Sequence, residues 1–318
     1  MTATRATSSA VDLVDDHAAV PRVGFFTDTS ICIGCKACEV ACKEWNHVPH
    51  RQPAWSGKSY DNTGKLGADT WRHVAFIEQR RASGPDQVEL AEVPHGAGTS
   101  EGDARLVTPE VAAWLETPDR SSSPPVVDPA DLRWLMSSDV CKHCTRAACL
   151  EVCPTGALFR TEFGTVVVQA DVCNGCGYCV PACPFGVIDQ RKDDGRAWKC
   201  TLCYDRLKGD MTPACAQACP TQSIQFGELA ELRGRAHHRL EQLQGAGVAG
   251  AQLYGADEND GVGGMAAFFL LLDRPEVYGL PPDPVVTTRD LPSMWRAAAG
   301  AAAALVGAVA LAAIGGKK

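Results

Sequence analysis

The cysteines constrain this chain more than any other feature. The 318-residue sequence holds sixteen of them, and they fall into four runs of four with none left over. The runs are Cys32-x2-Cys35-x2-Cys38-x3-Cys42, Cys141-x2-Cys144-x4-Cys149-x3-Cys153, Cys173-x2-Cys176-x2-Cys179-x3-Cys183 and Cys200-x2-Cys203-x11-Cys215-x3-Cys219. A division into fours without remainder indicates that each cysteine serves as a ligand.

The spacing indicates which ligand role. A C-x2-C-x2-C-x3-C run followed by proline is the bacterial ferredoxin pattern, in which three thiolates bind one [4Fe–4S] cluster and the fourth binds a second cluster. A proline follows the fourth cysteine in the last three runs, and Lys43 takes that place in the first. Gly34, Gly175 and Gly177 free backbone amides that can donate to the sulfurs. His143, inside the second run, is expected to lie near a cluster without binding it.

Two other uses of cysteine compete with this interpretation. A disulfide framework is typical of small secreted domains, and cysteines spaced this tightly bridge poorly. C-x2-C pairs also bind Zn2+, but zinc sites take such ligands in twos and would leave the third cysteine of each run without a role. A zinc-stabilised structural scaffold stays open as an alternative.

Length and charge set broad limits. The chain is long enough for two domains, and its net charge of −8, with lysine and arginine scattered, gives no indication of nucleic-acid binding. Residues 1–22 show neither a secretory apolar region nor a twin-arginine pair, and their Ala, Thr, Ser and Asp content predicts a flexible leader.

Hydrophobic patterning predicts short strands and one longer helix between the cysteine runs. The predicted elements are strands at 23–27, 71–78 and 223–226, a hairpin formed by 157–160 with 164–169, and a helix over 228–244. Trp45 is expected to pack beside a cluster. The charged residues between Cys203 and Cys215 predict an exposed polar loop.

Residues 81–130 differ in character from the rest. They are rich in glycine, proline and serine, with short apolar pieces between. A small helix is predicted from Pro109 to Leu115, with Thr108 as its N-cap. We interpret this segment as a surface insertion suited to contact a partner.

The C-terminal tail carries the second strong signal. Residues 297–316 are twenty positions without a charged or polar side chain, and as a helix they would be about 30 Å long, which matches the hydrocarbon core of a bilayer. Trp295 and Arg296 precede this stretch, and Lys317 and Lys318 follow it, as interface anchors do. Its alanine and glycine content also suits packing against another helix. A single membrane span is predicted, with a soluble alanine-rich helix as the alternative.

These motifs together resemble those of the iron–sulfur (beta) subunits of membrane-bound, molybdenum- or tungsten-dependent formate dehydrogenases, within the complex iron–sulfur molybdoenzymes. The resemblance covers most of the chain from about residue 23 onward. The residues that carry it are the first run with Glu44-Trp45-Asn46, Lys199-Cys200-Thr201-Leu202-Cys203, Gly261-Val262-Gly263-Gly264, and Arg274-Pro275-Glu276-Val277-Tyr278-Gly279-Leu280-Pro281 before the C-terminal span.

The resemblance implies an α+β fold of two tandem bacterial 2[4Fe–4S] ferredoxin-like domains, with a surface insertion and a C-terminal transmembrane helix. The implied parts are a leader at 1–22, a first ferredoxin-like domain from 23–80 with 197–245, the insertion at 81–130, a second ferredoxin-like domain at 131–196, a C-terminal extension at 246–293, and the membrane helix at 294–316.

The resemblance also implies the ligand sets of four [4Fe–4S] clusters, in which the middle runs exchange their fourth cysteine and the outer runs do the same. Spacing by itself supports only the middle exchange. The implied sets are Cys32, Cys35, Cys38 and Cys219; Cys141, Cys144, Cys149 and Cys183; Cys173, Cys176, Cys179 and Cys153; and Cys200, Cys203, Cys215 and Cys42.

The function implied is electron transfer. A molybdenum- or tungsten-pterin catalytic (alpha) subunit would oxidise formate, and a membrane cytochrome b or quinone-reactive (gamma) subunit would receive the electrons. Residues 297–316 would lie in the bilayer, and the resemblance favours the extracytoplasmic face of that membrane for the rest of the chain. No residue pattern here indicates bond chemistry by this chain itself. The same role in a membrane hydrogenase, or in a dimethyl sulfoxide, polysulfide or nitrate reductase, is the alternative.

Overall fold

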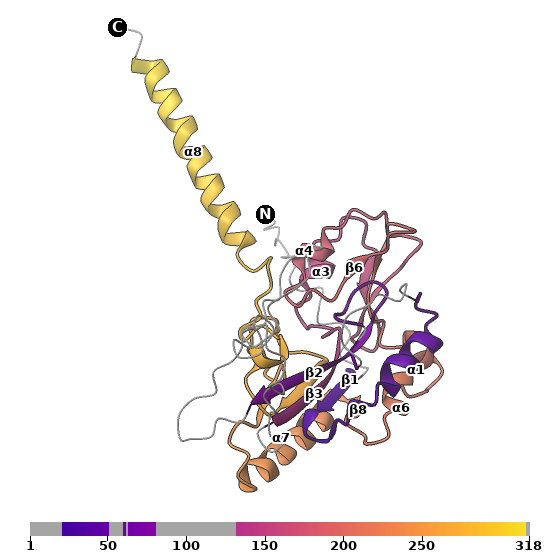
Figure 1. Cartoon of the computed structure of the whole chain (residues 1–318). Helices are drawn as coiled ribbons and strands as arrows, with labels where there is room; N and C mark the ends of the chain where they lie inside the picture. Colours follow the sequence, from indigo (N-terminus) through magenta and orange to yellow (C-terminus); the bar gives the residue numbers. More distant parts are fainter. Residues whose placement is uncertain (1–20, 51–59, 62, 81–131, 316–318) are drawn as a thin grey trace, which may run out of the picture.

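A computed structural model describes residues 21–50, 60–61, 63–80 and 132–315 as a mixed α/β body with one long helix projecting from it (Figure 1). The insertion predicted at 81–130, its helix from Pro109 to Leu115 and nearly all of the leader lie outside the described residues. The described elements therefore concern the cysteine-bearing body and the tail.

A four-stranded sheet forms the centre of the body, in the order β8 (Ile224–Glu228), β1 (Val23–Asp28), β10 (Ala267–Leu271) and β9 (Gln252–Tyr254). β1 runs antiparallel to β8 and parallel to β10. The five residues of β10 are all buried, as expected for an apolar strand with neighbours on both sides. The segment 246–293, expected as an extension, thus supplies two strands of this sheet.

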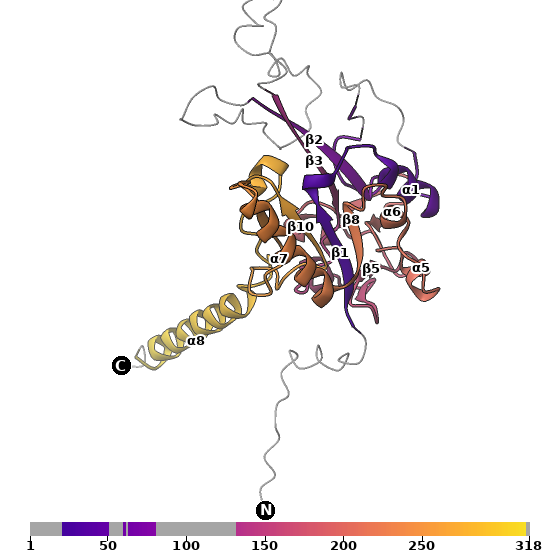
Figure 2. The ribbon, with the colours of Figure 1, turned by 90° about the horizontal axis from the view of Figure 1, so that it is seen from below.

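Helix α7 (Leu229–Gly245) packs on this sheet (Figure 2). Leu229, Leu232 and Ala236 are its buried residues, and their spacing of three and four places them on one helical face. Across the core, the rings of Phe26 and Phe268 stack with centroids 5.4 Å apart. The predictions of strands at 23–27 and 223–226 and of a helix over 228–244 are confirmed.

The other described strands form three two-stranded sheets. β2 (Arg72–Arg80) and β3 (Leu132–Val140) form a long antiparallel pair in which Arg72 faces Val140. Two short hairpins follow, β4 (Leu158–Arg160) with β5 (Val166–Val168) and β6 (Asp189–Gln190) with β7 (Ala197–Trp198). The predicted strand at 71–78 and the predicted hairpin of 157–160 with 164–169 are confirmed.

Short helices accompany the cysteines. They are α1 (Ala37–Trp45), α3 (Ala148–Glu151), α4 (Cys179–Ala182), α5 (Tyr204–Lys208) and α6 (Ala214–Gln217), with 3-10 turns η2 (Thr29–Ile31) and η5 (Pro275–Tyr278) elsewhere. Each of these α-helices contains or directly follows at least one cysteine. The helices therefore set the positions of the thiols relative to one another.

The prediction of an exposed polar loop between Cys203 and Cys215 was wrong in part. α5 and α6 occupy much of it, and Arg206 is only 7% exposed. The Arg206 guanidinium lies 4.1 Å from the centre of the Trp45 ring, and its Nε donates to the Thr212 carbonyl at 2.6 Å. A charged side chain that stacks and donates in this way can be buried, and composition alone does not reveal it.

Helix α8 (Leu291–Gly315) extends away from the body in both views (Figures 1 and 2). Within the described part of the chain it is the one helix long and apolar enough to cross a membrane, over Leu291–Ala310 with a mean hydropathy of 1.3. None of that stretch is buried, and Trp295 is 73% exposed. The helix is compatible with the predicted membrane anchor and begins six residues before the apolar stretch at 297.

Candidate iron–sulfur sites

All sixteen cysteines lie within the described residues, and none forms a disulfide. The structure brings them together in four sets of four, named here after one member each. The Cys32 group is Cys32, Cys35, Cys38 and Cys219; the Cys141 group is Cys141, Cys144, Cys149 and Cys183; the Cys173 group is Cys173, Cys176, Cys179 and Cys153; and the Cys200 group is Cys200, Cys203, Cys215 and Cys42.

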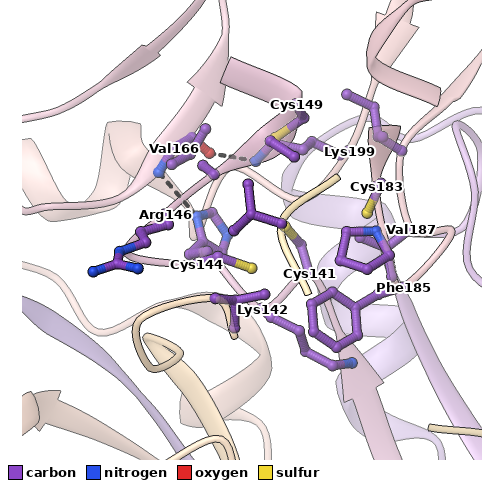
Figure 3. Close-up of a pocket in the computed structure, with 17 residues that line it drawn as sticks. Cys141, Lys142, Cys144, Arg146, Cys149, Val166, Cys183, Phe185, Val187 and Lys199 are labelled. Atoms are coloured by element: carbon purple, nitrogen blue, oxygen red, sulfur yellow. Dashed lines mark hydrogen bonds between the residues drawn. The ribbon is translucent and has the colours of Figure 1, made fainter. Parts of the chain in front are cut away.

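The four thiols of the Cys141 group line one cavity (Figure 3). Burial is the main cause that raises the pKa of Cys144, and the neighbouring Cys141, Cys183 and Cys149 raise it further. Burial likewise raises the pKa of Cys149 to about 12. Apolar side chains such as Val166 and Phe185 line the rest of the cavity together with the basic residues Lys142, His143, Arg146 and Lys199, so the space between the thiols suits a bound anionic group.

The Cys32 group lines a second cavity, together with Gly34, Ser138 and Ile224. Burial raises the pKa of Cys38 to about 11, although Arg72 and a hydrogen bond with Ser138 oppose that shift. Gly34 adopts φ = 65°, a left-handed conformation that favours glycine, and its backbone amide hydrogen-bonds to the Cys32 sulfur. The predicted amide donor at Gly34 is confirmed.

The Cys200 group is the most deeply buried set, with each thiol-bearing residue at most 7% exposed. Burial raises the pKa of Cys42 well above its usual value, and Cys200, Cys215 and Cys203 add to the effect. α1 and α6 pack against each other here, which brings the first and last cysteine runs together. The Asn46 side-chain amide approaches two sulfurs, at 3.8 Å from Cys42 and 3.7 Å from Cys203.

The Cys173 group lies at the surface. Cys176 is exposed, and only Cys179 is buried. Burial raises the pKa of Cys179 to about 11. Burial acts in the same direction on Cys153, but hydrogen bonds from the Leu158 amide and from Thr155 lower the pKa of Cys153 below its usual value.

The groups are neighbours in the order Cys32, Cys200, Cys141 and Cys173. The charge of Cys215 is among the influences that raise the pKa of Cys38, so the Cys200 group lies next to the Cys32 group. After burial, Cys141 is the largest influence that raises the pKa of Cys200, which joins the Cys200 and Cys141 groups. Cys179 acts on Cys149 and joins the Cys141 and Cys173 groups. The only exposed cysteines, Cys35 and Cys176, belong to the two end groups.

The surroundings of the thiols fit anionic iron–sulfur clusters. Arg72 and Lys199 are each 2% exposed, and neither has a carboxylate within 4.0 Å among the described residues. The Lys199 ammonium donates only to the Val166 and Cys200 carbonyls. Since a buried cation is unfavourable without an anion nearby, these two residues favour negative charge at the thiols.

The geometry favours clusters over zinc. Four thiols spread around one cavity suit a larger cubane, whose corner irons each take one thiolate. The zinc alternative is therefore disfavoured.

Three side chains near the thiols were not assigned a role from the sequence. Arg72 donates from Nη2 to the Cys215 sulfur at 3.1 Å, Ser138 Oγ lies 3.2 Å from the Cys38 sulfur, and Asn46 approaches two sulfurs as described. Only Asn46 belonged to a motif noted in the sequence. His143 lines the cavity of the Cys141 group, where its Nδ1 accepts from the Val166 amide at 3.1 Å.

Comparison with known proteins shows an iron–sulfur protein. A family model described as a 4Fe-4S dicluster domain matches residues 132–229. The chain is 35% identical over 263 residues to the formate dehydrogenase iron-sulfur subunit of Haemophilus influenzae, a match that covers 81% of this chain and 68% of that protein. It is 34% identical over 281 residues to the nitrate-inducible formate dehydrogenase iron-sulfur subunit of Escherichia coli, covering 87% and 78%.

A second kind of relative matches less of the chain. The B subunit of the anaerobic dimethyl sulfoxide reductase of Escherichia coli is 32% identical over 212 residues, or 67% of this chain and 76% of that protein. The formate dehydrogenase subunits match over a longer stretch at equal or higher identity. With its cysteines gathered into iron–sulfur sites, the chain is an electron-transfer protein and belongs to the family of formate dehydrogenase iron–sulfur subunits.

Proposed function

We propose that this chain binds four [4Fe–4S] clusters, one in each cysteine group, and relays electrons between a formate-oxidising subunit and a membrane partner. The observation that carries the proposal is the sorting of sixteen thiols into four groups of four. In each pair of runs the fourth cysteine is exchanged: Cys153 with Cys183, and Cys42 with Cys219. That exchange is what a pair of ferredoxin-like halves requires.

The linear order of the groups supports a conduction path. Each bound cluster supplies one-electron redox chemistry. The path would run from the Cys32 group through the Cys200 and Cys141 groups to the Cys173 group. The two ends carry the exposed thiols Cys35 and Cys176, while no cysteine of the two middle groups is exposed. Burial shields the interior of the path, and exposure at its ends gives each partner subunit a close approach.

The position of the tail supports one direction for the path. Just before α8, Thr287 Oγ1 donates to the Ala182 carbonyl at 3.2 Å, and Thr288 Oγ1 donates to Glu151. Ala182 lies on α4 and Glu151 on α3, the helices that carry Cys179 and Cys149. If α8 lies in the bilayer, the Cys141 and Cys173 groups are the ones held near it.

We therefore assign the Cys32 end to a molybdenum- or tungsten-pterin catalytic subunit and the Cys173 end to a membrane cytochrome b or quinone-reactive subunit. The relatives named as formate dehydrogenase subunits support formate as the electron source. In this proposal 23–80 with 197–245 and 131–196 are the two ferredoxin-like domains, and the body lies on the outer face of the membrane. Proteolysis of the body in intact spheroplasts tests the side.

The similarity to the dimethyl sulfoxide reductase B subunit supports a second candidate, the same relay running toward a reductase. The metal and substrate of the co-purifying large subunit separate the candidates. Formate oxidation with molybdenum or tungsten supports the first proposal, and sulfoxide reduction without formate oxidation supports the second. Nickel in that subunit would point to a hydrogenase.

The deciding experiment uses the native complex, purified from membranes without oxygen. Formate is added, and low-temperature electron paramagnetic resonance spectra are recorded before and within seconds of addition. The proposal expects interacting [4Fe–4S] signals to appear. If dithionite reduces the clusters and formate does not, the relay role stands and formate is excluded as the electron donor. Fewer than four clusters after full reduction, with the iron content to match, would contradict the ligand assignment.

A further inference from the structure

Arg72 lies at the junction of the Cys32 and Cys200 groups. It is the first residue of β2, and its side chain is 2% exposed. Its Nη2 donates to the Cys215 sulfur at 3.1 Å. Among the hydrogen bonds of the described residues, this is the one in which a charged side chain donates to a cysteine sulfur. The contact ties a fixed positive charge to the Cys200 group.

Ser138 extends the same contact to the Cys32 group. Arg72 Nη1 lies 3.2 Å from the Ser138 carbonyl oxygen and 3.4 Å from its hydroxyl oxygen. That hydroxyl lies 3.2 Å from the Cys38 sulfur. Because the hydroxyl can accept from the guanidinium while it donates to the thiolate, it can serve both neighbours at once. One guanidinium is thereby linked to a sulfur in each of two groups.

The rest of the environment leaves this charge without another anion. No carboxylate of the described residues lies within 4.0 Å of Arg72, and its Nε has no hydrogen-bond partner. The face of the Phe25 ring lies 4.9 Å away and contributes a weaker attraction. Burial alone would lower the pKa of Arg72, but the thiolates of Cys215, Cys38, Cys200 and Cys42 raise it above its usual value.

We propose that Arg72 is a cation shared by two clusters, which raises the reduction potentials of those in the Cys32 and Cys200 groups together. Reduction adds one negative charge to a cluster, so a fixed cation beside both clusters stabilises the reduced state of each. Arg72 is a positioning and tuning residue in this role and exchanges no electron itself. This inference rests on the proposed assignment of one [4Fe–4S] cluster to each group.

The test is a potentiometric titration of the purified complex with dithionite and mediators, followed by electron paramagnetic resonance. Signals are assigned with the Cys35→Ser complex: the signal that disappears belongs to the Cys32 group, and the signal that loses its magnetic splitting belongs to the neighbouring Cys200 group. Arg72→Gln is expected to lower the potentials of the Cys32-group and Cys200-group clusters, each by at least a tenfold change in the reduction equilibrium, or about 59 mV for one electron. The other two clusters are expected to keep their potentials.

Three companion variants sharpen the result. Arg72→Lys keeps the charge and is expected to shift both potentials by less than half as much. Ser138→Ala removes the link to Cys38 and is expected to lower the potential of the Cys32-group cluster alone. Arg235→Gln removes a charge from an exposed ion pair with Glu231 on α7, and no cluster potential is expected to change.

The outcomes separate this inference from the proposed function. Fewer than four [4Fe–4S] signals in the unmodified complex would defeat the proposed function. Suppose instead that four signals are present. The shared-cation role alone is then defeated if Arg72→Gln changes no potential, changes the potential of one cluster only, or changes all four potentials equally. If Arg72→Gln does not assemble, the other two variants decide. The role is supported if Ser138→Ala shifts only the potential of the Cys32-group cluster and Arg72→Lys shifts both potentials slightly. Any other result overturns it.

Discussion

The Cys200 and Cys173 groups hold the same number of thiols in opposite surroundings. All four residues of the Cys200 group are buried, and Arg72 and Asn46 approach its sulfurs. In the Cys173 group Cys176 is exposed, and backbone amides with Thr155 provide hydrogen bonds to Cys153. The two groups therefore differ in the residues around their thiols, and residues distant in sequence would decide how a cluster in each group is stabilised and tuned.

The largest expected difference comes from removing one ligand in each group. Cys200→Ser leaves a hydroxyl and three thiols buried around Arg72 without a complete cluster, so we expect little assembled complex and an iron content near zero in what remains. Cys176→Ser removes an exposed ligand, so we expect an assembled complex with one cluster damaged. Iron content and the yield of purified complex measure both outcomes.

Cys176→Ser also tests the relay itself. Electron transfer from formate to quinone is expected to fall at least 100-fold, while formate oxidation with an artificial dye continues, because that dye can accept electrons before the break. Loss of the dye reaction as well would mean that the chain is needed for assembly of the catalytic subunit. Equal loss of complex in both cysteine variants would remove the contrast between the two groups.

A glycine beside the Cys173 group is expected to give the next largest effect. Gly175 has φ = 72°, and a Cβ there would lie 2.6 Å from the Gly195 carbonyl oxygen. Gly156 has a similar φ of 69° but open space at its Cβ position. Gly175→Ala is therefore expected to cost about 2–4 kcal/mol and to weaken the Cys173-group signal, whereas Gly156→Ala costs about 1–2 kcal/mol.

Thermal unfolding of the complex and the resonance spectra compare these two alanine variants. Gly156→Ala is the matched control, since both substitutions place a side chain on left-handed backbone and only one creates a clash. Equal melting temperatures for the two variants would show that the approach of Gly195 is not what requires glycine at position 175.

Removing one polar contact from each group is expected to have a smaller effect. Asn46→Ala takes away the amide near Cys42 and Cys203, and Thr155→Val takes away the hydroxyl near Cys153. Hydrogen bonds to sulfur raise the potential of a cluster, so each variant is expected to lower one potential by less than a tenfold change in the equilibrium, or under about 59 mV. The same potentiometric titration applies, and an upward shift in either variant would contradict this account.

The smallest effects are expected at Trp45 and Trp198, which make the same two kinds of contact: the indole nitrogen donates to an aspartate, and an arginine stacks on the ring. Trp45 Nε1 donates to Asp205 at 2.8 Å, and Arg206 stacks 4.1 Å from its ring centre. Trp198 Nε1 donates to Asp194, with Arg191 at 3.9 Å. Trp45→Phe and Trp198→Phe should each cost about 1 kcal/mol or less with the iron content unchanged, as calorimetry and iron analysis would show. A loss of iron in either variant would reveal a closer link to its cluster.

Several local elements could be predicted from the sequence. Short apolar runs were enough to predict β1, the β4–β5 hairpin and α7, because the pattern that predicts each of these elements lies within its own residues. The cysteine spacing predicted iron–sulfur ligands and the exchange of Cys153 with Cys183, whereas the outer exchange of Cys42 and Cys219 came only from the resemblance to a family, and the four ligand sets stay a prediction.

The residues proposed to tune the sites could not be predicted from the sequence, because their contacts are made between segments far apart in it. Arg72 meets Ser138 only because β2 pairs with β3 across residues 81–131, and no local pattern encodes that register. Arg206 is buried because it stacks on Trp45, far away in sequence. The place of β10 between β1 and β9 likewise depends on a parallel pairing with a long connection.

The order of strands in the central sheet bears on how the chain is completed during synthesis. β1 is made first, yet its neighbours β8 and β10 are among the last elements to emerge from the ribosome. The first cysteine run likewise meets Cys215 and Cys219 only after the eight cysteines from 141 to 183 are complete. The cysteines from 32 to 42 therefore wait longest in a growing chain for the cysteines that they meet in the folded protein.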